Sequence, residues 1–449
     1  MSGARHASGH LFSLDPARTY PVLARGDGVY VWDADGNRYL DAIAGIAVMN
    51  LGYGRREIIE AMRRQAELLP FAVGNIFSNE PAEELAAQLA QLAPAGLDWV
   101  HFSSGGSEAN EIAIKLARQY HVERGQPGRH LIISRWTSYH GATLATLAAS
   151  GNPGRRRKYQ PLLLDFPHIA PSYCYRCPFG LTHPACGIEC AIDLERAIEA
   201  AGPERVAAFI VEPVVASVGG AIAPVPGYFP MIREICDRHD ILLIADEVVT
   251  GLGRTGANFG VDHWSVTPDI ITLGKGASAG YAPLGAVIIH DRIRAEFAAR
   301  GAAFEHIFTF GGNPVSAAVG LAVLAAWRDE QVLGNVRRVA GVFRDALEDL
   351  RKYPFVGDVR TFGLMAGIEF VADRDSGRPF PPGLAVAALV REAGMANGIV
   401  TYPGTGVAGE PGGDIISLYP PLTFTPRDVD EMRERLIATF DSLAADLAF

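Results

Sequence analysis

The strongest constraint on the fold is an alternation of short apolar segments with helical ones in the middle of the chain. Between Val100 and Ile289, runs of aliphatic and β-branched residues recur and are separated by stretches with helical spacing. Strands that alternate with helices predict an α/β fold, in which helices cover a mostly parallel sheet. We therefore expect a large domain over residues 61–320. Its predicted strands are Leu131–Ser134, Ala207–Glu212, Ile241–Asp246, Asp269–Leu273 and Ala286–Ile289.

The two ends of the chain predict a smaller α+β domain. A hairpin is expected over Tyr30–Tyr39, because two strand-like runs flank a turn of Asp and Gly. Further strands are expected over Phe362–Phe370 and Ile415–Leu418. Residues 321–449 are assigned to this domain, and residues 1–60 are expected to pack with it.

Lysine is rare in this chain, and one of its four lysines has a distinctive setting. Lys115, Lys158 and Lys352 lie on a helix face, in a basic run and in a polar turn. Lys275 instead follows the predicted strand Asp269–Leu273 and stands between two glycines, which leave little side-chain bulk beside its amine. Amines do covalent chemistry when their site lowers the amine pKa. Lys275 is therefore a candidate nucleophile, with a solvated loop charge as the alternative.

A carboxylate ends the apolar strand Ile241–Asp246. Ligands of open α/β sheets bind at this edge, outside the carboxyl ends of the strands. A buried carboxylate is costly unless it is paired, so we expect Asp246 to have a cationic partner. An Asp that caps the next turn is the structural alternative, but it does not explain the isolated Lys275 that follows the next strand.

A loop of small residues before a helix is a candidate anion site. Val100–Phe102 is expected to be a strand, Ser103–Ser107 a loop, and Glu108–Tyr120 an amphipathic helix. The start of such a helix presents free backbone N–H groups and the positive end of the helix dipole to an anion. The alternative is a plain helix start, because Ser107 is a good N-cap residue.

The segment Gly251–Gly256 matches the glycine pattern of a dinucleotide-binding fold and follows a strand. No amphipathic helix is expected after it, because Ala257–Gly260 continues as a loop. The acidic residue that should follow about 20 positions later is not preceded by a second clear strand. A dinucleotide-dependent oxidoreductase is therefore kept only as an alternative. A P-loop is excluded, because Lys275 is followed by Gly276 instead of Ser or Thr.

A reactive amine, a buried acid and a phosphate cradle are the parts of a pyridoxal 5′-phosphate site. The chain resembles the class III, or omega-type, aminotransferases of fold type I over nearly its whole length. Seven segments carry the resemblance in the order and approximate spacing of that family. They are Gly28–Gly36, Ser104–Asn110, Ser138–Gly141, Val211–Pro213, Asp246–Val248 with Gly253–Gly256, Lys275–Gly276 and Thr309–Pro314.

The resemblance implies two catalytic residues and three neighbours of the cofactor ring. Lys275 would form the Schiff base and move a proton between the substrate and the cofactor. Asp246 would pair with the pyridinium nitrogen. Val248 and Tyr139 would cover the two faces of the ring, and Glu212 would lie near Asp246.

The resemblance also implies that the phosphate is bound by two subunits. Gly106 and Ser107 would hold the phosphate of their own subunit, and Thr309 would reach the phosphate of the neighbour. The protein is therefore expected to be a homodimer with shared active sites, or a dimer of dimers. No metal ion is expected in the catalytic site.

Two positions depart from the pattern of this family. Many relatives have Gln directly after Asp-Glu-Val, where it contacts the ring hydroxyl, whereas this chain has Val249. Some relatives carry an Arg shortly before a Pro-Pro pair near the C-terminus, and Gly413–Pro421 has none. Another donor must then bind a substrate carboxylate. A pocket of Val, Tyr and Leu would suit an apolar amine.

The implied activity is a ping-pong transamination. An amino group would pass from a primary amine, or from an ω- or β-amino acid, to an α-keto acid, with pyruvate as the expected acceptor. An aminomutase and a dialkylglycine decarboxylase are the alternatives within the family. The net charge of −10 argues against a nucleic acid partner. Neither a secretory signal in Met1–His10 nor a membrane-spanning apolar run is expected, so we predict a cytoplasmic enzyme.

Four of the five cysteines lie close together in the sequence, at Cys174, Cys177, Cys186 and Cys190. This spacing could bind zinc or form two disulfides. Because cytosolic thiols stay reduced, zinc is the sharper hypothesis, and a surface insert with free thiols is the alternative. The cluster lies outside the predicted catalytic residues in either case.

Overall fold

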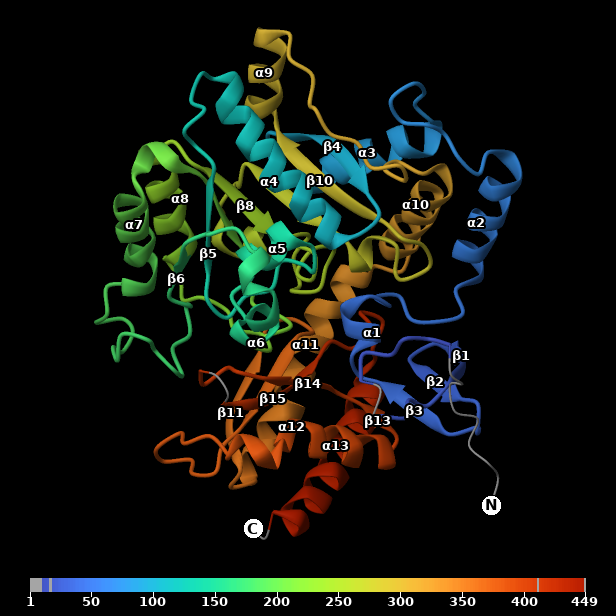
Figure 1. The fold of residues 1–449 in the computed structure, drawn as a ribbon. Helices are drawn as coiled ribbons and strands as arrows, with labels where there is room; N and C mark the ends of the chain where they lie inside the picture. The colour runs from blue at the N-terminus through green and yellow to red at the C-terminus, as the bar shows by residue number, and fades with distance from the viewer. Residues whose placement is uncertain (1–9, 16–17, 410–411, 448–449) are drawn as a thin grey trace.

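A seven-stranded sheet forms the centre of the larger region in Figure 1. The computed structural model describes residues 10–15, 18–409 and 412–447, so residues 1–9, where no secretory signal is expected, lie outside it. Only β10 runs antiparallel to its neighbours in this sheet, which confirms the mostly parallel prediction. In spatial order the strands are β4 (Leu97–Ser103), β10 (Gly285–His290), β9 (Ile270–Leu273), β8 (Leu242–Asp246), β7 (Val206–Val211), β5 (Leu131–Arg135) and β6 (His168–Ile169).

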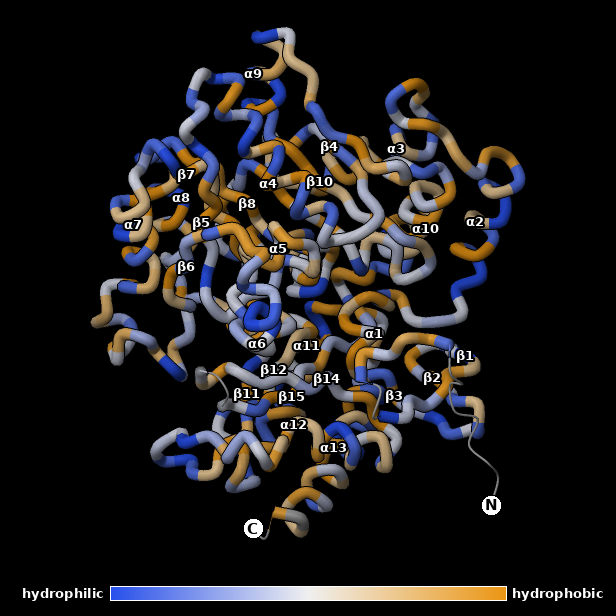
Figure 2. Tube along the Cα trace, viewed as in Figure 1, coloured by the Kyte–Doolittle hydropathy of each residue, from blue (hydrophilic) through white to orange (hydrophobic). Residues whose placement is uncertain are grey.

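Helices cover both faces of this sheet, and its central strands are therefore buried along their whole length. Ala208 and Ile210 of β7 pack with helix α4 (Gly106–Glu123) on one face. Phe209 and Val211 pack on the other face with α7 (Glu189–Ala201) and α8 (Tyr228–Arg238). Figure 2 shows hydrophobic residues along these strands. No helix within the described residues is long and apolar enough to cross a membrane.

The smaller region contains two four-stranded sheets and joins both ends of the chain. The predicted hairpin is confirmed, since β2 (Tyr30–Asp33) pairs antiparallel with β3 (Arg38–Asp41). β3 also pairs in parallel with β13 (Ile399–Val400), so the N-terminal sheet is completed by a C-terminal strand. The domain boundaries at residues 60 and 320 stay a prediction. The other strands are β1 (Leu23–Asp27) in the first sheet, and β11 (Val356–Thr361), β12 (Ala366–Phe370), β15 (Asp414–Leu418) and β14 (Tyr402–Thr405) in the second.

Six further helices pack around these sheets and against one another. Helix α10 packs against α2 and α3, and α13 packs against α11 and α12. One hydrophobic cluster joins Leu40 and Ile58 from the N-terminal segment to Phe343 and Leu436 from the C-terminal helices. The helices are α2 (Arg56–Leu68), α3 (Glu80–Leu92), α10 (Pro314–Asp329), α11 (Val332–Glu348), α12 (Val386–Ala396) and α13 (Pro426–Asp446).

The predicted strand Phe362–Phe370 is too long, because its first part is a turn. Phe362 and Met365 exchange backbone hydrogen bonds, and Gly363 between them has a φ of +59°. This left-handed conformation suits glycine and ends the strand. The true strand begins at Ala366, and β11 precedes the turn.

All five cysteines are free thiols. Cys174, Cys177, Cys186 and Cys190 line one small cavity of about 20 Å³. Among the residues that the structure describes, no three His, Cys, Asp or Glu side chains are grouped so that they could hold a metal ion. The zinc hypothesis therefore finds no preformed site in this cluster.

Candidate active site

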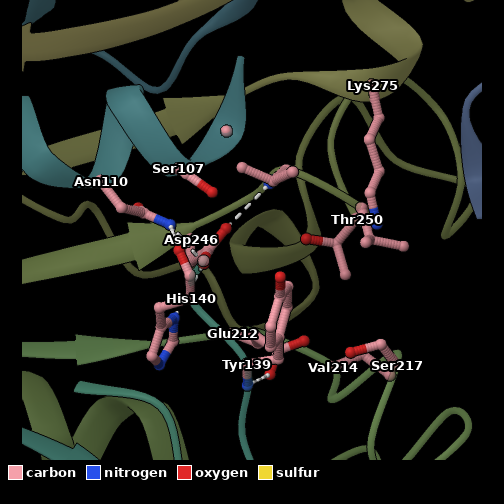
Figure 3. A pocket seen from close by; sticks show the side chains of 14 residues that line it. Ser107, Asn110, Tyr139, His140, Glu212, Val214, Ser217, Asp246, Thr250 and Lys275 are labelled. Atoms are coloured by element: carbon pink, nitrogen blue, oxygen red, sulfur yellow. Dashed lines mark hydrogen bonds and ion pairs between the residues drawn. The ribbon is translucent and has the colours of Figure 1, made fainter. Parts of the chain in front are cut away.

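A cavity of about 190 Å³ lies where several strands of the large sheet end (Figure 3). Seven of the eight predicted site residues line it, and Thr309 does not. The seven are Gly106, Ser107, Tyr139, Glu212, Asp246, Val248 and Lys275. Asp246 ends β8, Glu212 follows β7, and Lys275 follows β9, so the parallel strands bring these charged side chains to one edge.

Lys275 has a strained backbone and close glycine neighbours. Its φ of +42° is left-handed, which is uncommon for a residue with a side chain. A β-carbon on Gly276 would lie 2.0 Å from Asn50 Nδ2, and one on Gly274 would lie 3.0 Å from the Gly106 nitrogen. A side chain at Gly276 would therefore displace Asn50, and one at Gly274 would crowd the start of α4.

The cavity lowers the pKa of Lys275 to about 8. Burial is the largest cause, because it disfavours the ammonium form. The carboxylates of Asp246 and Glu212 act in the opposite direction and favour the cation. About a tenth of the amine is then neutral at pH 7, far more than for a solvated lysine, and the neutral form is the nucleophile.

Asp246 is held by hydrogen bonds from neutral groups and an imidazole. It is 4% exposed, and its Oδ2 accepts hydrogen bonds from Asn110 Nδ2 and from His140 Nδ1, both at 2.8 Å. Its Oδ1 accepts from the Val248 nitrogen at 3.1 Å. No lysine or arginine of the described chain forms an ion pair with it. Among the described residues, the expected cationic partner is therefore not a lysine or arginine; the group at ion-pair distance is the His140 imidazole.

Asn110 and His140 line the cavity but were not predicted as site residues. Asn110 Nδ2 also donates to the His140 carbonyl at 2.7 Å, and its Oδ1 accepts from Thr272 Oγ1 at 2.7 Å. The sequence pattern could have identified Asn110 as a site residue, because it is a polar residue on the buried side of α4, between Ala109 and Ile112. Figure 3 shows Asn110 and His140 beside Asp246, while the Lys275 side chain extends from another side of the cavity.

The N-terminus of α4 faces the cavity through Gly106 and Ser107. The helix begins at Gly106 and has no side-chain cap. Ser107 Oγ instead accepts a hydrogen bond from the Ala142 nitrogen at 3.1 Å, so the plain N-cap interpretation of Ser107 is wrong. A β-carbon on Gly106 would lie 2.8 Å from Val248 Cγ1. The first N–H groups of a helix lack intrahelical partners, which leaves them available to an anion.

Glu212 fixes the loop that carries Tyr139. Its Oε1 accepts from the Tyr139 nitrogen and its Oε2 from the Ala216 nitrogen, both at 3.0 Å. Burial raises the pKa of Glu212, and the nearby Asp246 adds to this effect. Arg135, which is buried, donates to the Glu212 carbonyl at 2.6 Å. Glu212 therefore positions the aromatic ring that lines the cavity.

Comparison with known proteins assigns the chain to a family. The model of the aminotransferase class III family matches residues 15–440. The chain belongs to the class III aminotransferases. It is 36% identical to a putrescine–pyruvate aminotransferase of Pseudomonas aeruginosa, over 94% of this chain and 91% of that protein.

Solved structures of this family share the fold. An (S)-enantioselective omega-transaminase from Thermomicrobium roseum is 40% identical, with a TM-score of 0.90, and the match covers 97% of this chain and 96% of that one. A transaminase from the marine bacterium Virgibacillus is 35% identical, also with a TM-score of 0.90, over 98% and 97% of the two chains. These matches confirm fold type I. Class III aminotransferases use pyridoxal phosphate to transfer amino groups.

The glycine-rich loop of this class III aminotransferase has a structural function. Arg254 in its centre is fully buried and donates to the Leu364 carbonyl at 3.0 Å and to Asn50 Oδ1 at 2.6 Å. No long helix follows the loop; the next element is a short 3₁₀ turn, Gly260–Trp264. Gly251–Gly256 therefore ties the two regions together, and the dinucleotide interpretation of it is wrong.

Two further positions for which the sequence made a prediction are Val249 and Thr309. Val249 lines the cavity, so the position where many relatives have Gln presents an apolar side chain here. Thr309 is exposed, away from the cavity of its own chain. Its neighbours Ile307 and Phe310 are 54% and 60% exposed, which is unusual for large apolar residues unless another surface covers them.

Proposed function

We propose that this protein is a pyridoxal phosphate-dependent transaminase that moves an amino group from a primary amine, or an ω- or β-amino acid, to an α-keto acid by a ping-pong mechanism. Pyruvate is the proposed acceptor. The observation that carries the proposal is the meeting of Lys275 and Asp246 in one cavity. There burial lowers the pKa of the lysine to about 8, and the carboxylate has no lysine or arginine partner among the described residues.

The residues of the cavity fit this cofactor. Asp246 offers a buried carboxylate to a protonated ring nitrogen, and the start of α4 at Gly106 and Ser107 offers N–H groups to a phosphate. Val248 and Tyr139 line the cavity and would cover the two faces of the ring. When bound, the cofactor supplies an electrophilic carbon and a ring that accepts the electron pair of the broken C–H bond.

Lys275 would act through its Nζ in both parts of the cycle. In the resting enzyme this amine would hold the cofactor aldehyde. Once free of the aldehyde, Nζ would take the proton from the substrate Cα and deliver it to the former aldehyde carbon of the cofactor, on the other side of the amino nitrogen. A pKa of about 8 suits this shuttle, because the amine must be neutral to accept the proton and charged to donate it.

Asp246 would hold a proton on the ring nitrogen. Asn110, His140 and the Val248 nitrogen donate to its two oxygens and keep the carboxylate oriented. A protonated ring nitrogen is a better electron sink, and the positive ring would lie beside the Asp246 carboxylate as its cationic partner.

We further propose a homodimer with shared sites. The exposed Thr309 would reach the phosphate of the neighbouring subunit, and a second copy would cover the apolar residues around it. Phe71 and Phe310 lie in contact, with ring centroids 6.0 Å apart, so two segments contribute to one exposed apolar surface. We call the exposed apolar residues of these two segments the apolar face; they are Leu68, Leu69, Phe71, Val73, Ile76, Phe77, Ile307 and Phe310. The cytoplasmic location stays a prediction.

A donor and acceptor panel tests the proposed reaction. Initial rates with aliphatic amines, aryl amines and ω-amino acids would be measured against pyruvate and 2-oxoglutarate. We expect activity with pyruvate and parallel lines in double-reciprocal plots, as a ping-pong mechanism requires. Carbon dioxide release would indicate a decarboxylase instead, and turnover without a second substrate would indicate an aminomutase.

A further inference from the structure

One arginine without an acidic partner among the described residues contacts a tyrosine that lines the active-site cavity. The guanidinium carbon of Arg155 lies 4.6 Å from the centroid of the Tyr139 ring, which lines the cavity. Its Nη2 donates to the hydroxyl of Tyr402 at 3.3 Å. Arg155 is exposed, and within the described parts of the chain it forms no ion pair with a carboxylate.

The local structure holds Arg155 in this place. It belongs to the short helix α6 (Pro153–Arg156), whose cap residue Asn152 accepts a hydrogen bond from the Arg155 nitrogen at 3.1 Å. The neighbouring Arg156 is buried and donates to the carbonyls of Leu147, Ala148 and Ser150. Arg156 therefore anchors the backbone of the helix, while Arg155 points to two tyrosines from distant parts of the sequence.

One observation connects Arg155 to the reacting amine, and a second shows that the cavity can hold a polar ligand group. Burial, then the charge of Arg254 and last that of Arg155 lower the pKa of Lys275, so Arg155 acts electrostatically on the reacting amine. Ser217 also lines the cavity, and its buried hydroxyl has no hydrogen-bond partner. A buried polar atom without a partner indicates a polar ligand group that the protein alone does not supply.

We propose that Arg155 binds the carboxylate of the α-keto acid acceptor and thereby determines the preference of the enzyme for keto acids. Tyr402 would orient the guanidinium, and a planar guanidinium can bind a carboxylate through two parallel hydrogen bonds. Gly413–Pro421, where some relatives have an arginine, contains none, so the acceptor needs a donor from elsewhere. This inference rests on the proposed transaminase function and names the residue that recognises its acceptor.

The proposal is tested by substituting Arg155 and comparing two acceptors, one with a carboxylate and one without. Arg155→Met removes the charge but keeps an unbranched side chain, Arg155→Lys keeps the charge, and Lys158→Met removes an exposed charge three residues away. Rates would be measured with one amine donor and either pyruvate or butanal, which has no carboxylate. We expect Arg155→Met to raise the KM for pyruvate at least about tenfold and the KM for butanal less than about twofold. Arg155→Lys should be intermediate, and Lys158→Met should match the wild type.

Equilibrium binding of propanoate to the cofactor-loaded protein separates this proposal from the proposed function. Propanoate carries the carboxylate but cannot react, so its Kd reports the anion site alone. We expect Arg155→Met to weaken binding at least about tenfold. An equal KM rise for both acceptors, or an unchanged Kd for propanoate, would overturn the role of Arg155. A wild type that binds propanoate through Arg155 but transaminates nothing would instead overturn the proposed function.

Discussion

Asp246 is the residue whose chemistry depends most on its hydrogen bonds. Asn110 and His140 hold one of its oxygens, and the carboxylate is buried at the end of β8. In Asp246→Asn, an amide of the same shape cannot hold a proton on the ring nitrogen. We expect cofactor binding to persist and kcat to fall by about 100-fold or more, measured by cofactor absorbance and steady-state rates. Wild-type kcat in this variant would rule out the electron-sink role.

The lowered pKa of Lys275 predicts how the rate of cofactor uptake changes with pH. Burial lowers its pKa from 10.5 to about 8, so its amine is mostly charged below pH 8 and mostly neutral above it. Only the neutral amine attacks an aldehyde. The rate of pyridoxal phosphate uptake by the apoprotein should therefore rise with pH, with a midpoint near 8.

Stopped-flow absorbance across a pH series measures this rate. Lys275→Ala provides the background, because it lacks the amine that reacts. A midpoint near 10.5, as for a solvated lysine, would show that the cavity does not lower the pKa of Lys275.

At the scale of elements, the turn after β9 depends on close packing between the two regions. A β-carbon on Gly276 would meet Asn50 Nδ2 at 2.0 Å, and Asn50 accepts a hydrogen bond from the buried Arg254. Gly276→Ala should therefore displace Asn50, lower stability by about 1–3 kcal/mol and weaken cofactor binding. Thermal unfolding and cofactor content measure both effects.

Gly341 is the matched control for this substitution. It lies inside helix α11, and a β-carbon there would have nothing within 4 Å. Gly341→Ala should raise stability by about 0.5–1 kcal/mol, because alanine restricts the unfolded chain. If both variants behaved alike, steric packing at Gly276 would not explain the glycine.

The elements were largely predictable from sequence, whereas their long-range contacts were not. The apolar runs around Ile241–Asp246 and Ala207–Glu212 identify buried parallel strands, because strands covered on both faces need continuous apolar sequence. The partners of Asp246 could not be found in this way, since Asn110 and His140 come from segments more than 100 residues away. The apolar pattern of residues 362–370 also did not predict the turn at Gly363, because this turn packs against the backbone of Arg254, far away in the sequence.

At the scale of the whole molecule, the apolar face around Thr309 predicts the assembly. Phe310 is 60% exposed and contacts Phe71. In Phe310→Asp, a charge would be buried between subunits, which is costly without a partner. We expect the molar mass from light scattering to fall from dimer toward monomer, and activity to fall with it as Thr309 loses the neighbouring site.

Leu384 is a suitable control for this substitution, because it is also apolar and exposed, at 41%, but lies in the smaller region. Leu384→Asp should leave both mass and activity unchanged. A fully active wild-type monomer would contradict the shared-site assembly. Sequence alone could suggest this assembly only through family resemblance, since exposure of Ile307 and Phe310 is a property of the folded surface.

The most direct test is to identify the side chain that carries the cofactor. Borohydride would reduce the lysine–cofactor linkage in the purified holoenzyme, and peptide mass mapping would then locate the added pyridoxyl phosphate. We predict the added mass on Lys275. Modification of Lys115, Lys158 or Lys352 in its place, or of no lysine, would contradict the assignment of the active site.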